Sequence, residues 1–277
     1  MKSTAKDSLA SLTQAHRRLT HEGVTLTYRV VGQGPCVVMI PSLGRGSEDF
    51  DALLPELARG GLRLILPEPR SIHDCSALDE TDALHDMAAD IARIIEVESA
   101  APAVLVGHAA GNWVARVLAH DRPDLTRAVA LVAAIVTNTV PKEVSASISA
   151  SFDMTLSDHE RLGHLQRVYF APSNDASVWL QGWWPDVLAA QRRAARQTPD
   201  KDWIRVADMH PTLYVAAAED VISPPPDLDA LCNTIGPKAQ NTVIANAGHA
   251  LLPEQPLAVA QSLLSWITNL PPVAVSA

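Results

Sequence analysis

Short apolar runs alternate with longer segments of helical periodicity along this chain, and this alternation constrains its fold more than any other feature. The pattern is typical of βαβ units, in which helices cover both faces of a mostly parallel sheet. The runs at 36–41 and 103–106 are apolar at successive positions, as expected of strands buried on both faces. We predict strands at 24–31, 36–41, 62–67, 103–108, 128–134, 212–218 and 242–246, after an earlier strand near 17–22 that forms a hairpin across Glu22-Gly23.

Helical spacing of apolar residues predicts helices between these strands. They are expected at about 48–59, 82–98, 110–121, 226–234 and 254–268. The stretch from 137 to 208 departs from this rhythm, since it holds no convincing strand and is typical of several helices rich in aromatic residues. An insertion there would lie over the carboxyl ends of the strands, where open α/β sheets bind ligands. We therefore expect a core at 1–136 and 209–277 and a helical lid at 137–208.

Charge and composition narrow the classes of partner. The chain has 31 acidic and 22 basic residues, a net charge of −9, and no Lys/Arg run longer than a pair, so nucleic acid is not an expected partner. No apolar run reaches the roughly 18–20 residues of a membrane helix, and residues 1–20 lack the apolar segment of a signal peptide. Three scattered cysteines argue against a disulfide framework and favour a reducing cytoplasm. Assembly as a homodimer is left open.

Neither a metal nor an organic cofactor is expected. His159 and His164 resemble the histidine pair of a zinc-binding helix, but an i, i+5 spacing places them on different faces, where the metal needs i, i+4. Gly32 and Gly34 lack the third glycine and the following helix of a dinucleotide site, and are interpreted as a turn.

The segment 103–118 predicts a strand, a very tight turn and a helix. Gly107 and Gly111 flank its centre in the spacing of a G-x-S-x-G elbow, in which small residues allow the chain to fold back sharply. The central side chain of such an elbow is held at the top of the sheet, near the positive end of a helix dipole. Here the centre is Ala109.

Two later strand ends carry the groups that would serve such a centre. Asp220 follows the strand at 212–218 and is the candidate acid, while its neighbour Glu219 is expected to point away because adjacent residues of an extended segment face opposite sides. His249 follows the last strand and is the candidate general base, oriented by the acid. Elbow, acid and histidine thus occur in chain order, each at the carboxyl end of a strand.

A loop after the strand at 36–41 completes the set. An oxyanion hole needs two backbone N–H groups directed at the oxygen that becomes negative, and the amides of Leu43 and Ala110 are the candidates. Arg45 in the same loop is interpreted as a solvated arginine rather than as a contact for a substrate carboxylate.

Together these motifs resemble the α/β-hydrolase superfamily from about residue 20 to 270. The resemblance implies an eight-stranded sheet, a helical lid after the sixth strand, and a site in which Ala109 occupies the nucleophile position, with Asp220 as acid and His249 as base. The chain departs from the pattern in two places: Pro41-Ser42 stands where many members carry His-Gly, and alanine stands in place of the nucleophile.

Ala109 has no atom that can attack a carbonyl, so this chain is expected to be inactive. An engineered replacement of serine is the favoured interpretation, because the acid, the histidine and the loop are intact. Aspartate or cysteine as the original residue, and a natural protein that binds a ligand without turnover, stay open. A lyase or cofactor-free oxygenase on the same fold is a further alternative.

The parent enzyme is expected to hydrolyse a carboxylic ester or lactone with a bulky apolar or aromatic group through an acyl-enzyme. Aromatic residues after the elbow and in the predicted lid favour such a substrate. The candidate substrate-binding residues are Ser42, Trp113, Tyr169, Trp183 and Trp184.

Overall fold

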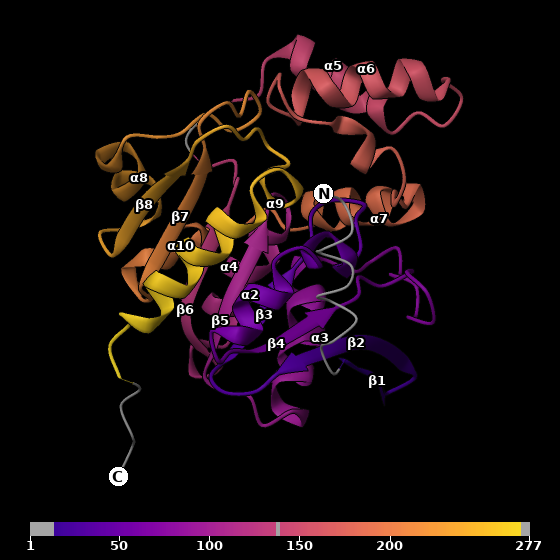
Figure 1. Cartoon of the computed structure of the whole chain (residues 1–277). Helices are drawn as coiled ribbons and strands as arrows, with labels where there is room; N and C mark the ends of the chain where they lie inside the picture. The colour runs from indigo at the N-terminus through magenta and orange to yellow at the C-terminus, as the bar shows by residue number, and fades with distance from the viewer. Residues whose placement is uncertain (1–13, 137–138, 273–277) are drawn as a thin grey trace.

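The computed structural model of the chain describes residues 14–136 and 139–272. Its centre is an eight-stranded sheet of order β1-β2-β4-β3-β5-β6-β7-β8, in which only the pairings of β2 are antiparallel (Figure 1). The strands are β1 (Gln14–His21), β2 (Val24–Gly32), β3 (Cys36–Ile40), β4 (Arg63–Pro67), β5 (Ala103–His108), β6 (Thr126–Val132), β7 (Thr212–Ala217) and β8 (Ala239–Ile244). The predicted fold class, a mostly parallel eight-stranded α/β sheet, is confirmed.

The hairpin between β1 and β2 turns where the sequence predicts it. Glu22 and Gly23 have φ values of +49° and +83°. Two successive residues with positive φ are characteristic of the turn whose twist matches that of antiparallel strands.

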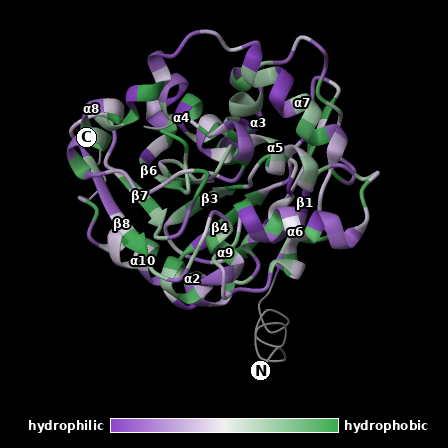
Figure 2. Ribbon diagram, turned by 90° about the horizontal axis from the view of Figure 1, so that it is seen from above, coloured by the Kyte–Doolittle hydropathy of each residue, from purple (hydrophilic) through white to green (hydrophobic). Residues whose placement is uncertain are grey.

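Helices cover both faces of the sheet. They are η1 (Ser47–Phe50), α2 (Leu54–Arg59), α3 (Leu84–Val97), α4 (Gly111–Asp121), η2 (Pro123–Leu125), α8 (Leu228–Ile235), α9 (Leu251–Glu254) and α10 (Pro256–Thr268). Buried residues of α3, α4 and α8 form one core layer, and those of α2, α9 and α10 form the other. In Figure 2 the helices show both hydrophilic and hydrophobic colours, as amphipathic helices on a buried sheet do. No helix of the described ranges is long and apolar enough to cross a membrane.

Several predicted boundaries differ from the structure: the first strand begins at Gln14 rather than near 17, and the strand expected at 128–134 is shifted by two residues to Thr126–Val132. The helix expected at 48–59 is divided into η1 and α2, because Pro55 has no N–H to continue a helix from the preceding turn. The helix expected at 254–268 is likewise divided at Gln255, which precedes Pro256 and has φ −133° and ψ +54°. The last strand runs from Ala239 to Ile244 rather than over 242–246, and it ends early because Asn246 turns the chain with a φ of +54°.

The chain between β6 and β7 contains no strand among its described residues. Its elements are α5 (Lys142–Ser151), α6 (Asp158–Val168), η3 (Ala176–Trp179), α7 (Pro185–Arg196) and η4 (Asp202–Asp208). In Figure 1, α5 and α6 lie beyond the sheet on the side of the strand arrowheads. Residue 137, the predicted start of the lid, lies outside the described residues, and the division into core and lid stays a prediction. Trp203, Val206 and Ala207 of η4 are buried in the core layer of α3 and α4.

Candidate active site

The turn between β5 and α4 is a strained elbow centred on Ala109. Ala109 has a φ of +44°, in the left-handed region that residues with a Cβ rarely adopt, and its N–H donates to the Val132 carbonyl at 2.8 Å. A Cβ at Gly107 would lie 2.6 Å from the Asn112 nitrogen, and a Cβ at Gly111 would lie 2.4 Å from the Ile40 oxygen. Both flanking glycines are therefore required by close packing of backbone on backbone.

The candidate acid and base are hydrogen-bonded to each other. His249 Nδ1 lies 2.8 Å from Asp220 Oδ2, and both side chains are almost completely buried. The other oxygen of Asp220 accepts hydrogen bonds of 2.8 Å from the N–H groups of Ile222 and Ser223. Glu219 is exposed, as the alternation of an extended segment predicts. The carboxylate is thus held in one orientation, with one oxygen directed at the imidazole.

Two backbone amides beside Ala109 are free to meet an oxyanion. Leu43 and Ala110 both line the cavity that contains Ala109 and His249. Within residues 14–136 and 139–272, neither amide donates to a protein acceptor, whereas the neighbouring Gly44 and Asn112 amides do. This arrangement is suited to two donors directed at one developing charge.

The cavity has a volume of ≈ 400 Å³, within the range of about 300–1,000 Å³ of small-molecule sites. Its lining combines elbow, loops and helical insertion: Ser42, Leu43, Ala109, Ala110, Asn112, Trp113, Ile135, Val140, Ser145, Ile148, Ser149, Phe152, Tyr169, Trp183, Arg192, Ile222 and His249. Four of the five candidate substrate-binding residues are in this set, and their roles stay predictions.

Trp184, the fifth candidate, does not line the cavity. Its ring packs edge-on against His73 at 5.5 Å, and its backbone N–H donates to the Gly44 carbonyl at 2.9 Å. Trp183 and Trp184 are neighbours in an extended segment before α7, so their side chains point to different sides. Only Trp183 faces the cavity.

Arg45 is not the solvated arginine that the sequence indicates. It is 4% exposed, and its Nε donates to both carboxylate oxygens of Asp49 at 2.9 and 3.0 Å. Its guanidinium lies 4.8 Å from the ring centre of Trp179 and 4.6 Å from that of Trp183. The residue therefore fastens the loop of Leu43 to the helical insertion and is occupied by protein partners.

His108 was missed as a site residue by the sequence reasoning. Its side chain is fully buried, and its Nε2 lies 3.1 Å from the carbonyl oxygen of His249. Burial, together with the nearby charge of His249, lowers the pKa of His108 to about 3. Neutral His108 therefore donates from Nε2 and ties the elbow to the backbone of the candidate base. The sequence could have indicated His108 as a site residue, because it lies between Gly107 and Ala109 in the elbow.

Two further side chains hold the loops of the site from outside. Gln191 Oε1 accepts a hydrogen bond of 2.8 Å from the N–H of Gly44, in the loop of Leu43. Glu254 accepts 2.7 Å hydrogen bonds from the N–H groups of Gly248 and Ala171. Both contacts join the helical insertion or the last helices to a loop of the candidate site, and no local sequence pattern marks them.

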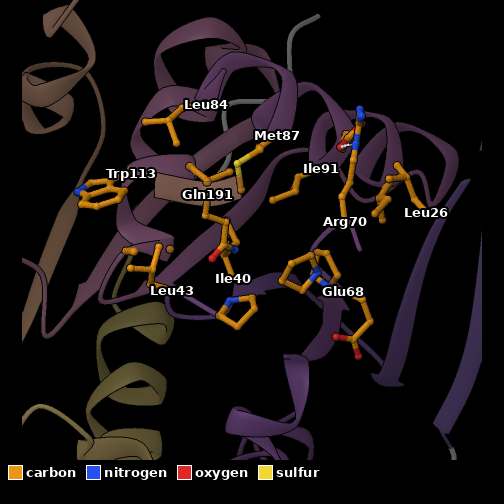
Figure 3. Close-up of a pocket in the computed structure, with 18 residues that line it drawn as sticks. Leu26, Ile40, Leu43, Glu68, Arg70, Leu84, Met87, Ile91, Trp113 and Gln191 are labelled. Carbon is orange, nitrogen blue, oxygen red and sulfur yellow. Dashed lines mark hydrogen bonds and ion pairs between the residues drawn. The ribbon is translucent and has the colours of Figure 1, made fainter. Parts of the chain in front are cut away.

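A second pocket of ≈ 50 Å³ adjoins the cavity and shares Leu43, Ala110 and Trp113 with it. Figure 3 shows Trp113 and Leu43 at one end of this pocket and Arg70 at the other. Arg70 is paired with Asp90 at 2.6 Å. Most of the other residues that line this pocket are apolar. Trp113 thus contributes to the walls of two adjacent spaces.

The described part of the chain has no group of three or more His, Cys, Asp or Glu side chains arranged to hold a metal ion. His164 is half-buried, does not line the cavity, and has a buried Nδ1 without a partner among the described residues.

Comparison with known proteins places this geometry in a family. Residues 37–262 match the model of the "Alpha/beta hydrolase family". "Putative carbamate hydrolase RutD" of Variovorax paradoxus (strain S110) is 33% identical over 110 residues, which are 39% of this chain. The match spans 41% of that relative's own length.

Solved structures share the fold across nearly the whole chain. A thermophilic esterase from Thermogutta terrifontis is 21% identical with a TM-score of 0.70, covering 93% of this chain and 99% of the esterase. The N-acyl homoserine lactonase AidH, in complex with N-hexanoyl homoserine, is 16% identical with a TM-score of 0.74, covering 96% of this chain and 100% of the lactonase. At these identities the likeness establishes the fold alone. With the family model matched over residues 37–262, the chain belongs to the alpha/beta hydrolase family.

Proposed function

We propose that this chain carries the binding site and the acid–base pair of an ester or lactone hydrolase, and that serine at position 109 would make it an acyl-transfer enzyme. The observation that carries the proposal is the hydrogen bond of 2.8 Å between buried Asp220 and His249, beside an elbow that holds residue 109 at a φ of +44°. An Asp–His pair of this kind orients a base and stabilises its cationic form during proton transfer.

Apart from the serine nucleophile, each step of the proposed reaction has a group in this chain. A serine hydroxyl at 109 would transfer its proton to His249 as its oxygen attacks the carbonyl carbon. The Leu43 and Ala110 amides would hold the resulting oxyanion, and His249 would return the proton to the leaving alcohol oxygen. Water would then enter by the same route and release the acid. The esterase and lactonase among the structural neighbours are consistent with this chemistry.

Alanine at position 109 removes the first of these steps. Its methyl group forms no acyl-enzyme, and the catalysis that remains after loss of a triad member comes from the oxyanion donors and binding alone. We expect the chain as it stands to bind its ligand without appreciable turnover. An engineered origin of Ala109 is proposed, and the codon at position 109 of the native gene tests it.

The decisive experiment compares Ala109→Ser with the parent chain on a panel of aryl esters and lactones. We expect kcat/KM to rise by about 10³-fold or more, and the rise to be absent in the double variant Ala109→Ser/His249→Gln. Equal kcat/KM for Ala109→Ser and the parent across the whole panel would refute the proposal. Product analysis in the same assay detects a lyase or oxygenase, because either yields products other than an acid and an alcohol.

A ligand-binding protein without catalysis is the second candidate, and Ala109 itself favours it. The elbow, the ≈ 400 Å³ cavity and the Asp220–His249 pair are all formed around alanine. Alanine in the native gene, with no hydrolysis by the serine variant and tight binding of a cavity ligand, would support this candidate over the first.

A further inference from the structure

One charged side chain of the cavity is left without an ionic partner. Arg192 of α7 is half-buried and lines the cavity, whose lining contains no Asp or Glu. Within the described ranges its guanidinium makes no hydrogen bond or ion pair, and its single ring contact is with Phe152 at 5.6 Å. By contrast, the adjacent Arg193 donates to the carbonyl of Asp79.

An aromatic wall runs from the candidate base to Arg192. Ring centres are 5.8 Å apart for His249 and Tyr169, 6.0 Å for Tyr169 and Trp183, and 4.6 Å for Trp183 and Phe152. The guanidinium of Arg192 lies beside the last of these rings. Three aromatic rings in successive contact thus connect His249 to the cationic group.

The cavity that Arg192 lines also has a polar, exposed part, unlike the elbow. Ser145 and Ser149 of α5 line the same cavity and are exposed, whereas Ala109 and His249 are buried. The Ser149 hydroxyl donates to the Ser145 carbonyl, so its oxygen lone pairs stay available to a donor. The cavity therefore combines buried Ala109 and His249, an aromatic wall, and a mouth lined by the exposed Ser145 and Ser149 and the half-buried Arg192.

We infer that the ligand of this cavity is an ester or lactone with a carboxylate at the end remote from the reactive carbonyl, and that Arg192 is the residue that recognises it. The inference rests on the proposed function in taking the cavity as the substrate site. A planar guanidinium presents paired N–H donors that match both oxygens of a carboxylate. Arg45 cannot take this role, because Asp49 already occupies its guanidinium.

Binding to the unmodified chain tests the inference without requiring turnover. The probes are adipic acid monoanilide, which carries a carboxylate, and its neutral counterpart with a primary amide in that place. We expect the carboxylate probe to bind about tenfold more tightly by calorimetry, as a charge-assisted hydrogen bond at a half-buried site implies. The preference should shrink when NaCl is raised from 50 to 500 mM, because the mouth is exposed to screening ions.

Variants on one helix identify the responsible charge. Arg192→Gln should abolish the preference, whereas Arg196→Gln removes the same charge from an exposed position outside the cavity lining and should retain it. Circular dichroism verifies that each variant is folded. Equal affinities for the two probes, no binding of either, or a preference that survives in Arg192→Gln would overturn the inference.

Failure of the two proposals can be told apart. An inactive Ala109→Ser variant together with an Arg192-dependent carboxylate preference contradicts the hydrolase proposal and supports this inference. Esterase activity in Ala109→Ser together with equal binding of both probes supports the hydrolase proposal and contradicts this inference.

Discussion

Gly111 allows the elbow to pack directly against the start of the loop of Leu43, and substitution by alanine tests this packing. A Cβ at Gly111 would lie 2.4 Å from the carbonyl oxygen of Ile40 and 2.6 Å from that of Pro41. Real Cβ contacts are longer than about 3 Å, so α4 or the end of β3 has to move by several tenths of an ångström. Neither obstacle is a side chain that can rotate away.

The expected change in the free energy of unfolding follows from two opposing effects. Overpacking against rigid backbone costs about 3 kcal/mol at the upper end of its usual range, and the better helix propensity of alanine returns up to about 1 kcal/mol. We expect Gly111→Ala to lower the free energy of unfolding by about 2 kcal/mol. Affinity for the adipic acid monoanilide should fall as well, because Pro41 leads directly into the loop of Leu43.

The same substitution at Gly163 is the matched control. Gly163 lies inside α6, and a Cβ there meets nothing within 4 Å. Gly163→Ala should therefore raise the free energy of unfolding by about 0.5–1 kcal/mol and leave ligand affinity unchanged. Urea unfolding monitored by circular dichroism measures both variants. A Gly111→Ala protein within about 0.5 kcal/mol of the parent would contradict the close-packing explanation.

Three further substitutions test the surroundings of the site. Arg45→Met leaves the buried Asp49 carboxylate unpaired and should lower the free energy of unfolding in urea by about 3–5 kcal/mol. Adding Asp49→Leu should recover most of this loss. A loss below about 1 kcal/mol for Arg45→Met would be inconsistent with a stabilising buried ion pair. Burial keeps His108 neutral by lowering its pKa from about 6.5 in the unfolded chain to about 3. Between pH 7 and pH 5 the unfolded chain therefore binds a proton at this imidazole that the folded chain does not, and the free energy of unfolding should fall by about 2 kcal/mol. That fall should be smaller by this amount in His108→Gln, and an unchanged pH dependence would count against a buried neutral imidazole. Trp113→Ala opens the wall shared by the two pockets and, in the Ala109→Ser background, should shift kcat/KM toward esters with longer acyl chains; the same chain-length profile as with tryptophan would argue against the shared wall.

The order of the elements and the candidate catalytic set were predictable from the sequence alone. Continuous apolar runs identified the buried strands, because a strand covered on both faces has no polar side. The spacing of Gly107 and Gly111 identified the elbow, because a chain that reverses this sharply tolerates no Cβ at either place. Asp220 and His249 could be paired in advance, since parallel strands bring their carboxyl ends to one edge of the sheet.

Which polar side chains face the cavity was decided only by the tertiary structure. Helical periodicity in α7 separates an apolar from a polar face, but it does not say what the polar face meets, so Arg192 was not distinguished from its neighbours. Arg45 lies in a loop whose composition is typical of a surface, yet it is buried, because Asp49 pairs with it locally and two tryptophans more than a hundred residues along the chain pack on it. Trp183 faces the cavity and Trp184 does not, since packing of the insertion on the oxyanion loop sets the rotation of that segment. Local patterns determine which elements form, and long-range contacts determine which of their side chains reach the site.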